Sequence, residues 1–205
     1  MVFLYQNFKS IQLGQALLFM QLTHAVCLPL PKLFFMSKHF PALGINEQLQ
    51  KALADLEISV PTDIQEKTIP VVLNQTEDLV AVAKTGTGKT AAFGLPLIQL
   101  VDVENENIQA LILAPTRELG QQIFKNLTDF SSKKLEISIA SIFGGIPIKP
   151  QIERLKKDTH VVVATPGRLI DLIQREAIDI SETSVLVLDE ADEMIAVLKE
   201  GLDTI

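Results

Sequence analysis

The 205-residue sequence is short of cysteine and aromatic residues: it has one cysteine, no tryptophan and one tyrosine. Because Cys27 has no partner in the chain, an internal disulfide is excluded, and the composition fits a reducing compartment. The histidines at 24, 39 and 160 are scattered, and no cysteine accompanies them. This pattern gives no basis for a zinc site of the His/Cys type.

The sequence also has no excess of positive charge. Its formal net charge is −7, and residues 1–35 carry only Lys9 and Lys32, which leaves −9 for the remainder. No overall basic field therefore draws the chain to nucleic acid, so any RNA binding must come from a local patch. The length suits one domain of ordinary size, and 47% hydrophobic residues are enough to build a core.

Charged residues are absent from the stretch between Ser10 and Pro31. One interpretation is a signal peptide, but no convincing small-residue cleavage site follows the apolar residues. Another is a membrane span, but three glutamines, a threonine and a histidine interrupt the apolar run. A third interpretation is a start codon assigned too early, because Met36 opens a segment that reads like an ordinary cytosolic N-terminus. We therefore expect residues 1–35 to be an apolar extension outside the fold and without function, and we expect no membrane partner.

The chain is organised around a glycine-rich stretch, AKTGTGKT, at residues 83–90. An apolar segment at 78–83 precedes it and predicts a buried strand. After it, apolar residues recur at the spacing of a helix. Glycine at 86 and 88 allows successive N–H groups to converge on phosphate oxygens. Lys89 would reach the β and γ phosphates, and Thr90 would ligate Mg²⁺ at the helix N-terminus.

A second apolar strand is predicted at the far end of the chain, in SVLVLDEAD at residues 184–192. It ends in Asp189 and Glu190. A nucleoside triphosphatase keeps at this position the acid that holds Mg²⁺ and the neighbour that orients the attacking water.

Together these two stretches resemble the DEAD-box family of ATP-dependent RNA helicases. Residues 189–192 carry the letters that name that family, and Ala83 in place of the usual P-loop glycine is typical of it. The resemblance implies ATP and Mg²⁺ as cofactors, with Lys89, Asp189 and Glu190 as catalytic residues. It implies phosphate binding by the loop residues Ala83, Lys84, Thr85, Gly86, Thr87, Gly88, Lys89 and Thr90.

The segment PTDIQ, residues 61–65, matches the adenine-recognition motif of the same family. The amide of Gln65 offers a donor and an acceptor together, which suits the edge of adenine. Phe40 lies 25 residues upstream, as the family's isolated aromatic does. The family usually has glycine and an aromatic where this chain has Glu57 and Ile58, and Ile58 can pack on a base without stacking as a ring.

Three further segments resemble the family's RNA-backbone motifs: PTREL at 115–119, the glycine pair at 144–145, and TPGR at 165–168. We expect Thr165 to cap the last helix and Pro166 to begin it. Hydroxyls, helix N-termini and arginines can contact phosphates without reading sequence. The RNA-binding candidates are Pro115, Thr116, Arg117, Glu118, Gly144, Gly145, Thr165, Pro166, Gly167 and Arg168.

Five predicted strands alternate with helices, which indicates an α/β fold with a doubly wound, mostly parallel sheet. By resemblance, residues 36–205 form a partial first RecA-like domain of the P-loop NTPase type, incomplete at its C-terminus, and the second helicase domain is absent. In that arrangement another strand lies between the strands at 78–83 and 185–189. The family supplies it from a Ser-Ala-Thr motif after residue 205. We therefore expect an unpaired gap at this point, and residues 36–205 alone to lack a stable fold.

The function implied is that of a cytoplasmic, RNA-dependent ATPase that, as a whole protein, separates short RNA duplexes. Two alternatives stay open at this point. One is another P-loop translocase, against which Gln65 and Phe40 argue. The other is an inactive fragment that binds nucleotide or RNA weakly.

Overall fold

The computed structural model describes residues 2–6, 39–74, 78–84, 86–131 and 135–194. Its strands are β1 (Val2–Gln6), β2 (Leu79–Ala81), β3 (Ala110–Leu113), β4 (Ile139–Ile142), β5 (Val161–Ala164) and β6 (Val185–Asp189). Its helices are the 3₁₀ helix η2 (Phe40–Leu43), α2 (Glu47–Asp55), α3 (Asp63–Asn74), α4 (Lys89–Leu100), α5 (Arg117–Ser131), α6 (Ile148–Leu155) and α7 (Pro166–Gln174).

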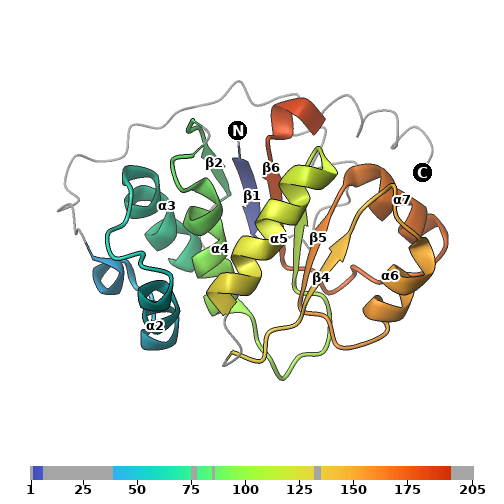
Figure 1. The fold of residues 1–205 in the computed structure, drawn as a ribbon, viewed down its shortest axis with the longest axis horizontal. Coiled ribbons are helices and arrows are strands. Elements are labelled where there is room, and N and C mark those ends of the chain that lie inside the picture. The colour runs from blue at the N-terminus through green and yellow to red at the C-terminus, as the bar shows by residue number, and fades with distance from the viewer. Residues whose placement is uncertain (1, 7–38, 75–77, 85, 132–134, 195–205) are drawn as a thin grey trace.

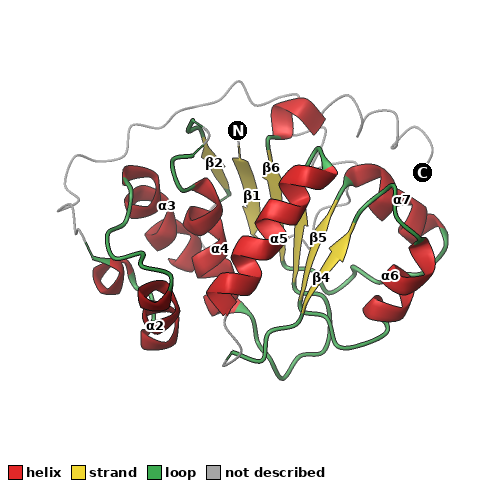
Figure 2. Cartoon of the chain, in the orientation of Figure 1, coloured by secondary structure: helices red, strands yellow, loops and turns green. Residues whose placement is uncertain are grey.

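The strands form one sheet in the order β2-β1-β6-β3-β5-β4 (Figures 1 and 2). Strands β3, β4, β5 and β6 are parallel, whereas β1 is antiparallel to both of its neighbours, β2 and β6. Strand β2 therefore runs in the same direction as the parallel group. The α/β fold with a mostly parallel sheet, predicted from the alternation of strands and helices, is confirmed.

Apolar side chains fill both faces of the sheet. On β3, Ala110 and Ile112 belong to one buried cluster with α3, α4 and α5, while Leu111 and Leu113 belong to a second cluster with α6 and α7. Continuous burial along a short strand is typical of parallel sheets covered by helices on both faces. The layers are therefore helix, sheet and helix, and the carboxyl ends of the parallel strands share one edge.

The expectation that residues 1–35 stand outside the fold is wrong for β1. Residues Val2–Gln6 lie between β2 and β6, where the sequence predicted an unpaired gap. The physical reason is that both neighbours offer backbone N–H and C=O groups in the middle of the sheet, and an extended apolar segment pairs with both rows at once. Whether residues 36–205 fold without β1 stays a prediction.

Helix α2 begins and ends as its sequence indicates, except at one residue. Asn46 caps its start by accepting the N–H of Leu49 at 3.0 Å, as expected for an asparagine cap. After the helix, Glu57 has φ +59°, and the next N–H, of Ile58, donates to the carbonyl of Leu53 at 2.8 Å. This is a helix end that glycine fills without strain, and it explains why glycine is usual there in the family that the sequence resembles.

Replacing Glu57 with glycine is predicted to stabilise the domain by about 1 kcal/mol, because the left-handed backbone costs more for glutamate than glycine loses in entropy. The melting temperature, followed by circular dichroism, should rise by about 2–4 °C. Lys51→Gly, on the same helix where the backbone is right-handed, should lower it instead. Equal losses in both variants would contradict this account of the helix end.

Candidate nucleotide and RNA site

The glycine-rich loop connects β2 to α4 at the carboxyl edge of the sheet. Helix α4 begins at Lys89, and Gly88 precedes it with φ +86°, after Gly86 with φ +78°. A Cβ on Gly88 would lie 2.3 Å from Nε2 of Gln65, so a side chain there is excluded by contact as well as by backbone angle. Thr85 lies outside the described residues. The predicted order of strand, glycine turn and helix is confirmed, with the strand shortened to Leu79–Ala81.

The PTDIQ segment is bonded directly to this loop. Nε2 of Gln65 donates to the carbonyl of Gly88 at 3.1 Å, and Oε1 of Gln65 accepts the N–H of Thr62 at 3.0 Å. The hydroxyl of Thr62 donates to the carbonyl of Thr87 at 2.9 Å. Only 4% of Gln65 is exposed. The segment before α3 and its first turn therefore restrain the backbone of the loop, and Thr62 contacts the loop together with Gln65.

The other two adenine candidates have different surroundings. Phe40 is 3% exposed and packs in the core cluster at the start of η2, which contacts α3. Ile58 is half-buried and packs against the same cluster. Both residues therefore contribute to the core beside α3, and their contact with a base stays a prediction. Each polar atom of the Gln65 amide keeps one further hydrogen-bonding position, since Nε2 carries two hydrogens and Oε1 two lone pairs.

The two carboxylates lie where β6 ends. Asp189 is 3% exposed, and its Oδ1 accepts the N–H of Glu190 at 3.1 Å. Burial raises the pKa of Asp189 above its ordinary value, and the nearby Lys89 ammonium opposes that shift. Glu190 has φ +53°, a conformation that costs a glutamate energy. The chain therefore keeps a buried carboxyl group and a strained neighbour opposite the glycine-rich loop.

The sheet brings Lys89 and Asp189 together. In the pairing of strands, Val2 of β1 is the partner both of Ala81, just before the loop, and of Asp189. Neighbouring strands lie about 4.8 Å apart, so the ends of β2 and β6 are separated by about 10 Å. The loop and the Asp189 carboxyl therefore lie on the same edge of the sheet, about two strand spacings apart.

The three segments predicted to contact RNA converge at the ends of β3, β4 and β5. A Cβ on Gly145 would lie 3.9 Å from the guanidinium of Arg117, and the N–H of Gly144 donates to the hydroxyl of Thr165 at 3.3 Å. Nη2 of Arg168 donates to the carbonyl of Ile146 at 3.1 Å. Segments far apart in sequence thus form one surface, and it begins beside the end of β6, because β3 pairs with β6.

Residues of this surface differ in how accessible they are. Thr116, Glu118, Gly145 and Gly167 are exposed, while Pro166 is buried beneath the start of α7. The expectation that Thr165 caps α7 and Pro166 begins it is confirmed for their positions. The Thr165 side chain makes no capping hydrogen bond, and its hydroxyl accepts the N–H of Gly144 instead.

Two arginine nitrogens on this surface are buried without a hydrogen-bond partner among the described residues: Nε of Arg117 and Nη1 of Arg168. A buried guanidinium nitrogen that donates to nothing is costly, and a phosphate oxygen would satisfy it. These nitrogens are the strongest local sign of an anionic ligand beyond the glycine-rich loop.

Within the described ranges there is no cluster of three or more His, Cys, Asp or Glu side chains that could hold a metal ion. In the same ranges no helix has both the length and the apolar character needed to cross a membrane.

Residues 62–205 match the family model for the DEAD/DEAH box helicase. The chain is 45% identical over 156 residues to the DEAD-box ATP-dependent RNA helicase CshA of Geobacillus kaustophilus, covering 76% of this chain and 33% of that protein. It is 44% identical over 156 residues to the ATP-dependent RNA helicase DeaD of Escherichia coli, covering 76% of this chain and 25% of that protein. The chain thus spans a quarter to a third of the length of these curated relatives.

Solved structures agree with this assignment. A DEAD box protein from Methanococcus jannaschii superposes with a TM-score of 0.73 at 39% identity, covering 80% of this chain and 45% of the other. Dbp5 of S. cerevisiae, bound to RNA and ADP BeF3, superposes with a TM-score of 0.72 at 30% identity, covering 82% of this chain and 43% of the other. The motifs, the sheet and the matched region lead to one conclusion: this chain belongs to the DEAD/DEAH box helicase family and carries its RecA-like domain.

Proposed function

We propose that this chain is the ATP-binding and RNA-binding part of an ATP-dependent RNA helicase, which in a whole protein couples RNA-stimulated ATP hydrolysis to local separation of RNA strands. The observation that carries the proposal is the juxtaposition of Lys89, at the start of α4, with the buried carboxyl of Asp189 across the sheet edge. The names of CshA and DeaD, both ATP-dependent RNA helicases, support it.

The loop residues bind the phosphates of ATP. The two glycines with positive φ allow successive backbone N–H groups to converge on phosphate oxygens, and the N-terminus of α4 adds the favourable end of its dipole. Lys89 supplies the full positive charge for the β and γ phosphates. Gln65 has the remaining donor and acceptor that adenine needs. Phe40 and Ile58, which pack in and against the core, would contact the base.

The residues present fit Mg²⁺ arriving with the nucleotide. Magnesium is commonly held by one or two carboxylates together with substrate phosphates, so a site without three protein acids is no obstacle. A cation offsets the desolvation that raises the pKa of Asp189. Asp189 and Thr90 would hold it, and when bound it neutralises charge developing on the phosphates. Glu190, adjacent to Asp189, would orient the attacking water.

RNA binds along the surface formed by the ends of β3, β4 and β5. Its contacts are to the backbone, through Thr116, Arg117, Gly145, Thr165 and Arg168, so this domain alone selects no sequence. The structural relative Dbp5 was solved bound to RNA and ADP BeF3, which supports RNA and nucleotide as the two ligands. Both ligands, and the single cysteine, favour a cytoplasmic location.

Lys89→Ala is predicted to weaken binding of Mg²⁺ and ADP by about 10- to 100-fold, because one charge-assisted contact of about 1.5–3 kcal/mol is lost. Calorimetric titration measures the affinity. Lys51→Ala, an exposed lysine on α2, serves as the control and should bind like the unchanged chain. If the Lys89→Ala variant bound Mg²⁺ and ADP as tightly as the unchanged chain, the assignment of the loop as a phosphate-binding loop would be wrong.

Asp189→Asn is predicted to raise the stability of the ligand-free chain at pH 7 by about 1 kcal/mol while abolishing Mg²⁺-dependent nucleotide binding. Because burial raises the pKa of Asp189, the folded state disfavours the ionised form. The stability gain should therefore shrink as the pH falls through that raised pKa, and vanish below 3.8, where the carboxyl is neutral in both states.

Thermal melts between pH 3 and pH 8 measure this difference, with Glu193→Gln, an exposed acid in the same segment, as the control. A stability gain that is independent of pH would show that the ionised carboxyl is not the cause.

Arg168→Ala is predicted to weaken RNA binding equally for an arbitrary single strand and its scrambled versions. The slope of log affinity against log salt should become shallower by about 0.7, the value for one phosphate on a single strand. Fluorescence anisotropy at several salt concentrations measures the slope. Arg175→Ala removes an exposed arginine from the end of the same helix, where it pairs with Asp171, and should leave the slope unchanged. A variant that discriminated between sequences would contradict a backbone-only site.

A further inference from the structure

Strand β1 lies in the sheet between two strands, β2 and β6, that are both distant from it in sequence. It pairs with β2 over Val2 to Leu4 and with β6 over all five of its residues. Its two neighbours run in one direction and β1 runs against both. Figure 1 shows it between them in the middle of that half of the sheet, with the N-terminal end at the edge where β6 ends.

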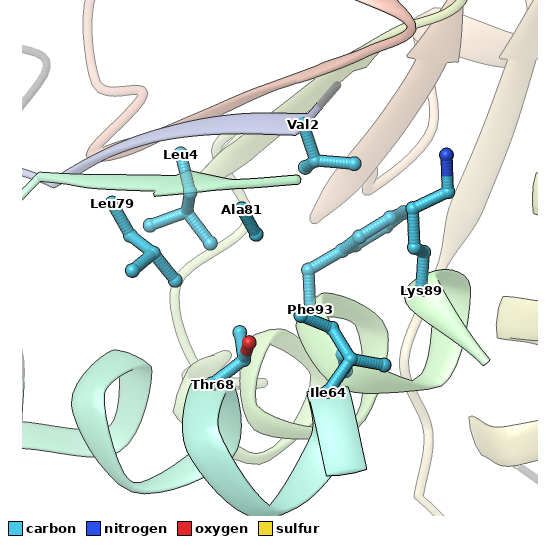
Figure 3. A pocket seen from close by; sticks show the side chains of 9 residues that line it. Val2, Leu4, Ile64, Thr68, Leu79, Ala81, Lys89 and Phe93 are labelled. Atoms are coloured by element: carbon cyan, nitrogen blue, oxygen red, sulfur yellow. The ribbon is translucent and has the colours of Figure 1, made fainter. Parts of the chain in front are cut away.

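The side chains of Val2 and Leu4 are buried in the core on the α3 and α4 face. They are 4% and 1% exposed and line a small cavity of about 10 Å³. Figure 3 shows that Ile64 and Thr68 of α3, Leu79 and Ala81 of β2, and Lys89 and Phe93 of α4 also line it. The alternate residues Val2 and Leu4 thus face the same core cluster as Leu79 and Val187, the residues that pair with Leu4.

Both neighbours carry site residues at their ends. Strand β2 leads into the glycine-rich loop, and β6 ends at Asp189. Without a strand between them, each would present a row of unpaired backbone groups in the interior of the sheet, and nothing would hold the two ends at a fixed separation.

We propose that β2 and β6 form a strand-binding slot, and that Val2–Gln6 fill it as a complementing strand added from the chain's own N-terminus. The mode is β-strand addition, in which main-chain hydrogen bonds supply the pairing and alternate side chains, here Val2 and Leu4, supply the register. The slot thereby makes residues 2–6 a positioning element for Lys89 and Asp189.

The pairing register gives a direct test in the full chain. With Cys27 replaced by serine, the pair Leu4→Cys and Val187→Cys should form a disulfide on mild oxidation, because antiparallel partners lie about 4.5–5.5 Å apart between Cα atoms. The control pair, Leu4→Cys with Leu186→Cys, places the two cysteines on opposite faces of the sheet and should not cross-link. Failure of the first pair, or equal cross-linking of both, would overturn the proposal.

A second measurement tests what the strand does for the sheet. Leu4→Asp should reduce hydrogen-exchange protection of amides in β2 and β6 at least tenfold more than in β4 and β5, because the slot loses its occupant. Val60→Asp introduces the same charge at a residue that is 58% exposed, and should leave the protection of all four strands unchanged. Unaltered protection of β2 and β6 in the Leu4 variant would also overturn the proposal.

A third arm rests on the proposed function, because it assumes that nucleotide binds at the ends of β2 and β6. Since the coupling is reciprocal, Mg²⁺ with ADP should raise the protection of amides in Val2–Gln6 of the unchanged chain. A cross-link at the predicted register without a rise in the protection of Val2–Gln6 supports the complementing strand and overturns the nucleotide proposal. A rise in protection without the register-specific cross-link supports nucleotide binding and overturns the complementing strand.

Discussion

The pairing of β1 with β2 and β6 is the constraint on which the rest of the structure depends. Backbone groups in the interior of a sheet have no water to bind, so each must find a partner in the chain. Here one short antiparallel strand satisfies two rows at once. It also sets the separation between the glycine-rich loop and Asp189, so the geometry of the candidate nucleotide site is a consequence of sheet pairing.

Around that framework, the site combines stabilising contacts with features that lower stability. Gln65 and Thr62 bind the loop backbone from α3, which restrains the conformation that phosphate binding needs before any ligand arrives. Asp189 is buried with a raised pKa, and Glu190 has a positive φ. Costs of this kind are common where binding a cation or a phosphate compensates for them.

The surface predicted to bind RNA also combines stabilising contacts with features that lower stability. Glycine, threonine and arginine from three connections pack against one another at the ends of neighbouring strands, and two guanidinium nitrogens there have no partner among the described residues. Arg117 and Arg168 bring positive charge to this surface of a chain whose formal net charge is −7. Strand β3 pairs with β6, so this surface begins beside the strand that ends at Asp189.

Local sequence determined much of this protein. The strand, glycine turn and helix around Lys89 and the apolar run ending at Asp189 follow from patterns within a few residues, because dihedral preference and burial period are local properties. The Asn46 cap and the alternation that indicates a parallel sheet are of the same kind. The family assignment rests on those motifs, and the matched region confirms it.

Tertiary structure alone decided which distant segments became partners. Val2–Gln6 is a short apolar segment followed by a long charge-free stretch, and no period within it shows which strands it joins. The burial of Phe40, the use of Gln65 to hold the loop, and the turning of the Thr165 hydroxyl toward Gly144 were equally hidden. Each depends on groups from segments that are distant in sequence, and those segments meet only once the tertiary structure has formed.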